Sequence, residues 1–219
     1  MTQTGSSDAG SPFATLRRFV RERAPAERCE MCSAAMRAEH QHLTDPVNRK
    51  LVCVCDGCAI LFGSQGETKY RRVPRRVRAL PDFQLSDGQW EALAIPIGMA
   101  FFFRNSAEGR VSAFYPSPAG PTQSMLGLEA WEEIVRSNPV LDQMEPDVEA
   151  LLVNRLNRMN GGGAPECYLV PVDECYKLVG LIRAHWRGLS GGAEVWKEIN
   201  GFFAGLKART ASRSEASHA

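Results

Sequence analysis

Two closely spaced cysteine pairs constrain the fold of this chain more than any other feature. Cys29 and Cys32 form the first C-x-x-C pair, and Cys55 and Cys58 form the second. A C-x-x-C turn places two thiolates on one side of a tight knuckle, and two knuckles can surround one metal ion as a tetrahedron. Because four protein ligands leave no open coordination position, the pattern predicts one structural zinc ion, with iron as the less favoured alternative.

The N-terminal residues and the distribution of cysteines indicate the cellular compartment of the protein. We find neither the basic region nor the apolar core of a signal peptide, so we expect a cytoplasmic protein with reduced thiols. Five of the seven cysteines fall between positions 29 and 58, which favours metal binding over disulfides. Cys167 and Cys175 have apolar neighbours and are expected to be buried thiols without a metal. Gly57 is expected to ease the turn of the second knuckle.

Three further side chains that could bind a metal lie between the two pairs: His40, His42 and Cys53. Residues 39–45 and 50–55 are predicted to form a hairpin, in which His40 faces Cys55 and His42 faces Cys53 on one side. Three roles remain open for these side chains. In the first, one of them replaces a knuckle cysteine on the zinc ion. In the second, a histidine donates a hydrogen bond to a thiolate of the zinc site. In the third, the three side chains form a second, open or redox-active site for an ion such as iron.

A basic segment follows the hairpin in a chain whose formal net charge is only +1. Pro74 and Pro81 keep this segment out of a helix, so we expect an extended ribbon at the surface. Guanidinium groups pair with carboxylates and with phosphates. We favour a protein partner over nucleic acid, because the chain shows no recognition helix and Tyr70 is the one aromatic residue in the segment. The predicted partner-binding residues are Arg71, Arg72, Arg75, Arg76 and Arg78.

The hydrophobic pattern predicts an α+β fold, with an N-terminal zinc-knuckle or ribbon-like hairpin followed by an antiparallel sheet packed with helices. The expected divisions are a disordered tail at 1–12, a helix plus zinc-knuckle module at 13–66, an α+β domain at 67–207 and a disordered tail at 208–219. Longer apolar runs are interrupted well before the roughly 20 residues that a membrane span needs.

Several local patterns refine this prediction. Residues 95–103 and 110–115 read as a hairpin, 148–156 and 168–172 as two more strands, and Asp173 as the N-cap of a helix. The last helix carries an apolar stripe that we expect to face the core. The stripe consists of Val195, Trp196, Ile199, Phe202, Phe203 and Leu206.

Two catalytic patterns are present in outline. Residues 188–192 match the G-x-S-x-G nucleophile elbow, but that motif requires a strand-to-helix turn, and here it connects two helices. A histidine-bearing hairpin between two cysteine knuckles, followed by a basic segment, also fits an HNH-type treble-clef nuclease. Residues 59–62 are apolar where such a nuclease needs a further polar ligand, so the nuclease is kept as an alternative only.

The order of the motifs resembles an uncharacterised bacterial family of unknown function that is often encoded beside nickel–iron hydrogenase genes. The N-terminal part of the resemblance is Cys29-x-x-Cys32, His40-x-His42 and Cys53-x-Cys55-x-x-Cys58. The remainder is AFFFRNS at 100–106, EPDVEA at 145–150, VGLIR at 179–183, WRG at 186–188 and EVW at 194–196. The resemblance implies an accessory or maturation role for a metalloenzyme, and it implies no mechanism.

Taken together, these patterns predict a non-enzymatic zinc-binding accessory protein. It would dock onto a nickel–iron hydrogenase subunit, or assist assembly together with a maturation factor, through the zinc knuckle and the arginines. One alternative is an electron-transfer or metal-delivery protein with a labile site at His40, His42 and Cys53. The HNH-like nuclease is the other.

Overall fold

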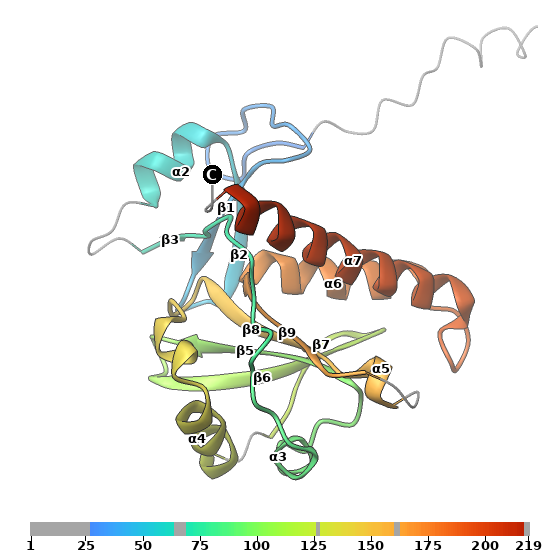
Figure 1. Cartoon of the computed structure of the whole chain (residues 1–219). Coiled ribbons are helices and arrows are strands. Elements are labelled where there is room, and N and C mark those ends of the chain that lie inside the picture. The colour runs from blue at the N-terminus through green and yellow to red at the C-terminus, as the bar shows by residue number, and fades with distance from the viewer. Residues whose placement is uncertain (1–26, 64–68, 126–127, 160–162, 217–219) are drawn as a thin grey trace, which may run out of the picture.

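The computed structural model of the chain describes residues 27–63, 69–125, 128–159 and 163–216. A small three-stranded sheet with one helix is followed by a six-stranded sheet, and both sheets are antiparallel (Figure 1). Helices pack on both faces of the larger sheet. The predicted α+β class is therefore confirmed.

The smaller sheet is built around the predicted hairpin. Strand β1 (Gln41–Asp45) pairs with β2 (Lys50–Val54), and the register places His42 opposite Cys53 as expected. The short strand β3 (Arg71–Arg72) pairs with the other edge of β1. Helix α2 (Asp56–Phe62) follows β2 directly. We call residues 27–63 together with β3 the cysteine module.

The division expected at residue 66 stays a prediction, and the strands that follow it show how the two parts are connected. Strand β3 still belongs to the cysteine module, whereas β4 (Arg78–Ala79) pairs with β9 at the edge of the larger sheet. Between these strands, the buried Val73 packs with Val148 and Val172 of the larger part, and its N–H donates to the His42 carbonyl at 3.0 Å. Apolar contact and backbone pairing therefore join the two parts.

The larger sheet has the strand order β4-β9-β8-β5-β6-β7. Its long strands are β5 (Met99–Asn105), β6 (Arg110–Ser117), β7 (Gly120–Gln123), β8 (Glu149–Asn154) and β9 (Glu166–Pro171). The turn from β5 to β6 is closed by the Asn105 side chain, which accepts from the Glu108 N–H at 3.1 Å. Gly109 in this turn has φ +64°, a conformation that costs glycine little.

One face of the sheet is covered by the two C-terminal helices. Phe101 and Phe103 point from β5 toward α6 (Val172–His185) and α7 (Gly192–Ala216), and they share a core with Ile199 and Phe203. Alternate residues of the same strands point to the opposite face. Burial on both faces explains why β5 and β8 read as continuous apolar runs.

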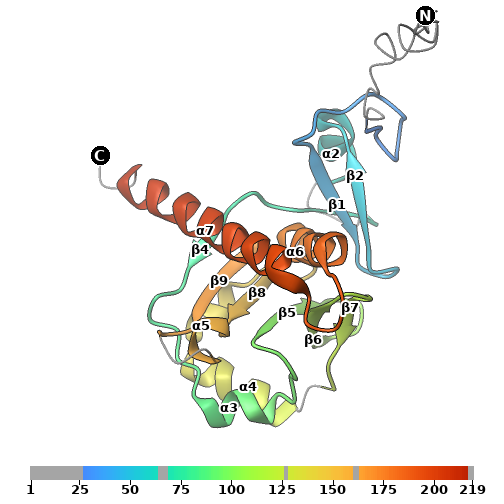
Figure 2. The same ribbon diagram turned by 90° about the vertical axis from the view of Figure 1, so that its right-hand side faces the viewer.

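The opposite face packs against α3 (Asp87–Ala92), α4 (Leu128–Ser137) and the 3-10 helix η1 (Pro139–Gln143), as seen in Figure 2. Ser86 begins α3 with a complete capping box: its hydroxyl accepts from the Gln89 N–H, and the Gln89 side chain accepts from the Ser86 N–H. A short helix, α5 (Leu156–Met159), follows β8.

Several details of the sequence prediction need correction. The N-cap of α6 is Pro171, because the Asp173 carboxylate contacts His42 rather than the start of its own helix. Helix α7 continues to Ala216, past the expected end at residue 207. Residues 188–192 connect α6 to α7, as expected. The predicted helix within residues 13–24 and the N-terminal tail lie outside the described residues.

The apolar stripe of α7 is confirmed except at one position. Val195, Ile199, Phe203 and Leu206 are buried, and Phe202 is partly buried against the same core. Trp196 is 38% exposed, and its ring lies 6.3 Å from that of Trp186. In the described part of the chain, no helix combines the length and the apolar character that crossing a membrane requires.

The difference in burial between Phe203 and Trp196 predicts different losses of stability when each is replaced by alanine. We expect Phe203→Ala to lower the free energy of unfolding by about 3–5 kcal/mol, because it opens a cavity in the core. Trp196→Ala should cost on the order of 1 kcal/mol, because much of that ring already contacts solvent. Urea unfolding of both variants tests this, and equal losses would contradict the assignment of Trp196 to the surface.

Candidate metal centres

The first cysteine pair lies on a tight turn. The Cys29 N–H donates to the Ala34 carbonyl at 2.9 Å, and the Ser33 N–H donates to the Cys29 carbonyl at 2.8 Å. Ser33 has φ +61°, so the residue after Cys32 reverses the chain in the left-handed conformation. This turn directs the two sulfur atoms of the pair to the same side.

The second pair begins helix α2. Cys55 is its N-cap, and Cys58 lies in its first turn. The expected need for glycine at position 57 is wrong: Gly57 does not have a positive φ, and a Cβ atom there would meet no other atom within 4 Å. Glycine is needed instead at the other end of the helix. A Cβ on Gly63 would lie 2.8 Å from Arg72 Cβ and 2.9 Å from Leu43 Cδ2.

The four cysteines come together as one group. Their sulfur atoms all lie within 4.8 Å of one another, and the sulfurs of Cys32 and Cys55 are 3.7 Å apart. In a tetrahedral site with Zn–S bonds of about 2.3 Å, neighbouring sulfurs are roughly 3.8 Å apart. The spacing therefore fits a single tetrahedral metal ion and is far too long for a disulfide bond. The group could hold a metal ion.

The ionisation of the four thiols also favours a cation. Burial acts to raise the pKa of Cys29, but backbone N–H donors of Cys55, Cys32 and Met31 lower that pKa to about 6. The pKa of Cys58 is raised to about 12 by burial and by contacts with the other three thiols. The Cys29 thiolate is thus stabilised, while the raised pKa values of Cys32 and Cys58 disfavour their ionisation, and a divalent ion would offset the repulsion between the thiolates.

Glu30, inside the first pair, fixes that pair to strand β2. Its N–H donates to the Cys53 carbonyl at 2.9 Å, and its carboxylate accepts from the Cys53 N–H at 2.8 Å. Lys50 donates to the same carboxylate at 2.8 Å and is the largest cause of the lowered pKa of Glu30. These contacts hold the first knuckle and Cys53 in a fixed relation.

His40, His42 and Cys53 form a second, separate group, whose ligand atoms also lie within 4.8 Å of one another. The two imidazole rings are 4.7 Å apart. Because the four cysteines already form a complete set, nothing in the geometry requires a histidine to replace one of them. Burial, followed by the negative charge of Glu30, raises the pKa of Cys53, so its thiol is protonated at neutral pH.

The sequence analysis missed the residue that fixes His42. Asp173 lies 131 positions further along the chain, and its Oδ2 is 2.8 Å from His42 Nδ1. An aspartate in the first turn of a helix is common, so the sequence gives no signal that this one contacts the hairpin. The contact joins the cysteine module to the start of α6.

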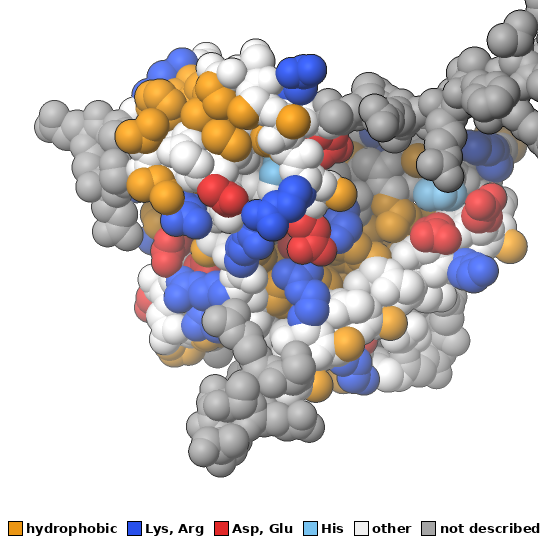
Figure 3. Space-filling model, turned by 90° about the horizontal axis from the view of Figure 1, so that it is seen from above, with side chains coloured by type: hydrophobic (Ala, Val, Ile, Leu, Met, Phe, Trp, Pro, Cys, Tyr) orange, Lys and Arg blue, Asp and Glu red, His pale blue; other side chains and the backbone are white. Residues whose placement is uncertain are grey.

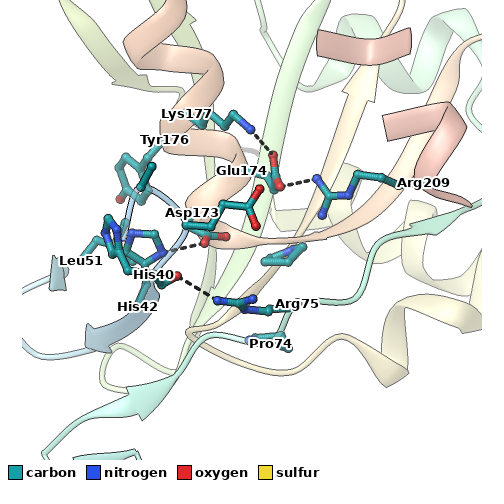
Figure 4. A pocket seen from close by; sticks show the side chains of 13 residues that line it. His40, His42, Leu51, Pro74, Arg75, Asp173, Glu174, Tyr176, Lys177 and Arg209 are labelled. Carbon is teal, nitrogen blue, oxygen red and sulfur yellow. Dashed lines mark hydrogen bonds and ion pairs between the residues drawn. The ribbon is translucent and has the colours of Figure 1, made fainter. Parts of the chain in front are cut away.

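Both histidines also line a cavity with a volume of about 660 Å³ (Figure 4). Leu51 adds a wall from the hairpin, Pro74 and Arg75 come from the connecting segment, and Tyr176 comes from α6. At the far side, the Glu174 carboxylate lies between Lys177 and Arg209. The cavity therefore lies where the hairpin, α6 and α7 meet.

Comparison with known proteins places this chain in a family. Residues 28–210 match the model of DUF5947, which is described as a family of unknown function. The chain belongs to this family. The matched range includes both groups of candidate metal ligands and the cavity that the histidines line. No curated protein and no solved structure matches the chain.

In this DUF5947 member, most of the predicted partner-binding arginines have acceptors within the chain. Arg71 pairs with Asp147, and Arg76 pairs with both Glu145 and Glu149. Arg78 donates to Gln143, Arg72 to Gln41, and Arg75 to the His40 carbonyl. The basic segment is therefore not a free ribbon along its whole length. Its role in binding a partner stays a prediction.

Metal analysis of single variants tests the four-cysteine group. We expect the purified protein to contain one tightly bound metal ion, and Cys58→Ala to lose it, because removal of one of four thiolates weakens metal binding and the folding of the module that depends on it. Cys175→Ala is the matched control: this residue of α6 is fully buried in the core of the larger part, and its replacement should leave the metal content unchanged. Full metal retention in Cys58→Ala would contradict the assignment.

Arg76 is expected to stabilise the fold more than its neighbours do. Glu149 is completely buried, and Arg76 is the guanidinium that neutralises it. Arg76→Ala should cost on the order of 2 kcal/mol, less than for a fully buried pair because Arg76 itself is partly exposed. Arg75→Ala should cost less than about 0.5 kcal/mol. Thermal or urea unfolding compares the two, and equal stabilities would show that the Glu149 pair contributes little.

Proposed function

We propose that the protein is a non-enzymatic zinc-binding accessory protein that docks onto a partner protein through its cysteine module. The observation that carries this proposal is the position of an exposed apolar helix face beside a closed set of four thiols. Ile60, Leu61 and Phe62 of α2 are 66%, 72% and 42% exposed, and only the buried Ala59 separates them from Cys58. We call these three residues the α2 patch.

Zinc is the ion that best suits the four-cysteine group. The ligands are four thiolates, the spacing is tetrahedral, and no coordination position remains for a substrate, which is typical of structural zinc sites. The module also has a very small apolar core, in which Cys29 and Cys58 pack with Leu43, Val52 and Val54. Such a core needs an ion to fold stably, so the zinc would hold α2 in place.

The α2 patch has the character of a binding surface. Space-filling Figure 3 shows hydrophobic side chains gathered over the cysteine module, with basic side chains close by. Three consecutive apolar side chains at the surface of a small module favour a protein contact. The exposed Arg72 lies against the end of α2 at Gly63, so a partner with acidic residues beside an apolar surface would fit.

Among the predicted partner-binding arginines, Arg72 and Arg75 are the best suited to this contact. Both are exposed, and each donates only to a neutral oxygen within the described residues. Arg71, Arg76 and Arg78 serve mainly to join the connecting segment to the larger part. The pairing of these arginines within the chain also makes the nuclease alternative less favourable, since fewer cations remain for a phosphate backbone.

The resemblance of the motifs to a family encoded beside nickel–iron hydrogenase genes supports a partner that belongs to the hydrogenase system. On that basis, the partner would be a hydrogenase subunit or one of the maturation factors that assemble it. A colourless protein with one zinc ion supports the structural role. A visible charge-transfer band would instead favour iron at the four thiolates.

Binding measurements on two matched variants test the docking surface. We expect Leu61→Asp to weaken binding to the isolated hydrogenase subunits or maturation factors at least tenfold, about 1.4 kcal/mol, because a carboxylate would be buried in the interface. Val47→Asp is the control, since Val47 is 74% exposed at the tip of the hairpin. Both variants should retain zinc. Equal binding by the two variants would contradict docking through the α2 patch.

A further inference from the structure

Two members of the group formed by His40, His42 and Cys53 line an open cavity. In Figure 4, both imidazole rings lie at the wall of this cavity beside Asp173. The arrangement of hydrogen bonds around the two rings shows which nitrogen atoms are available to a ligand.

His42 is oriented by a carboxylate. Its Nδ1 lies 2.8 Å from Asp173 Oδ2, and a carboxylate oxygen can only accept, so Nδ1 carries the proton. The Nε2 atom of a neutral His42 then presents a lone pair. Histidines that bind metal ions are held in this way, with one nitrogen on the metal and the other donating to a carboxylate or carbonyl.

His40 is oriented in the same manner. Its Nδ1 lies 3.2 Å from the Arg37 carbonyl and 3.1 Å from Glu27 Oε2, and both oxygens accept. The His40 side chain is only 10% exposed, and its Nε2 atom is buried without a hydrogen-bond partner in the described part of the chain. A buried lone pair without a partner is costly and uncommon, so this atom points to a missing ligand.

Asp173 supplies a second indication. Its other oxygen, Oδ1, is also buried without a hydrogen-bond partner among the described residues. The Asp173 carboxylate is partly buried against His42 and places negative charge beside the two rings. A cation placed between the rings would offset this charge.

We propose that His40 Nε2, His42 Nε2 and Cys53 Sγ bind a second divalent transition-metal ion, with an open coordination position that faces the cavity. Two imidazole nitrogens and one sulfur suit borderline-soft ions such as Zn²⁺, Co²⁺ and Ni²⁺. Three protein ligands leave one position for water or a small ligand. Asp173 acts as a positioning residue through His42. This site does not depend on the proposed docking function.

Cobalt is the probe, because Co²⁺ bound to sulfur and nitrogen absorbs visible and near-ultraviolet light. The full-length, untagged protein with one zinc ion per chain is titrated with Co²⁺, while absorbance, bound cobalt and released zinc are measured. We expect one equivalent of Co²⁺ to bind without release of zinc. A tetrahedral visible spectrum and a sulfur-to-cobalt charge-transfer band should appear together with this binding.

The variants locate the ion. His42→Ala should weaken Co²⁺ binding at least tenfold, and Asp173→Asn by about 10–100-fold through the lost orientation of His42. Cys53→Ser should remove the charge-transfer band. His185→Ala is the matched control, because His185 lies on α6 with its Nδ1 on the Leu181 carbonyl, and it should bind Co²⁺ as the wild type does.

Zinc analysis distinguishes the second site from the four-cysteine site. Each of these variants should still contain one zinc ion per chain. Failure of the wild type to bind Co²⁺, cobalt uptake matched by zinc release, or unchanged affinity in His42→Ala would each overturn the second site. None of these results would affect the assignment of the four cysteines, which is tested by zinc analysis of Cys58→Ala.

Discussion

The convergence of four thiols on one point determines the arrangement of the whole N-terminal part. Each pair is local, but the two pairs come from a reversed turn and from the first turn of a helix, and only the hairpin between them brings them together. The apolar core around them is too small to fix this geometry alone. An ion bound there would therefore set the position of β1, and β1 in turn presents His42 to Asp173 and pairs with β3. The interface between the two parts of the molecule depends on these contacts of β1.

The features that could be predicted from the sequence are those encoded over short distances. The C-x-x-C spacing, the pairing of His42 with Cys53, the β5–β6 hairpin and the buried stripe of α7 all follow from local periodicity. The contact between His42 and Asp173 could not be predicted, because it joins residues 131 positions apart and neither residue is unusual in its own segment. Trp196 fits the helical stripe by spacing alone, but it lies near the start of α7 beside Trp186 and remains partly exposed.

The arginine-rich segment shows why local charge is a weak guide to function. Taken by itself, the segment has the strongest positive charge in the chain, yet carboxylates from the loop after η1 and from β8 neutralise much of it. The pair between Arg76 and the buried Glu149 exists because β8 is covered on both faces, which leaves its acidic first residue with no access to water. Cationic segments that connect two parts of a protein can thus serve the fold first. The charge left for a partner is concentrated at Arg72 and Arg75.

Cys53 and Cys55 are separated by a single residue but belong to different groups. A metal ion at the four thiols restrains Cys55, and through Val54 and the Glu30 contacts it also restrains Cys53. Occupancy of one site would then change the affinity of the other, and thermodynamic linkage requires this effect to be reciprocal. Two ions so placed would bind cooperatively, because the first has already reduced the conformational entropy that the second would lose on binding. The two sites would then fill over a narrower range of metal concentration than two independent sites would.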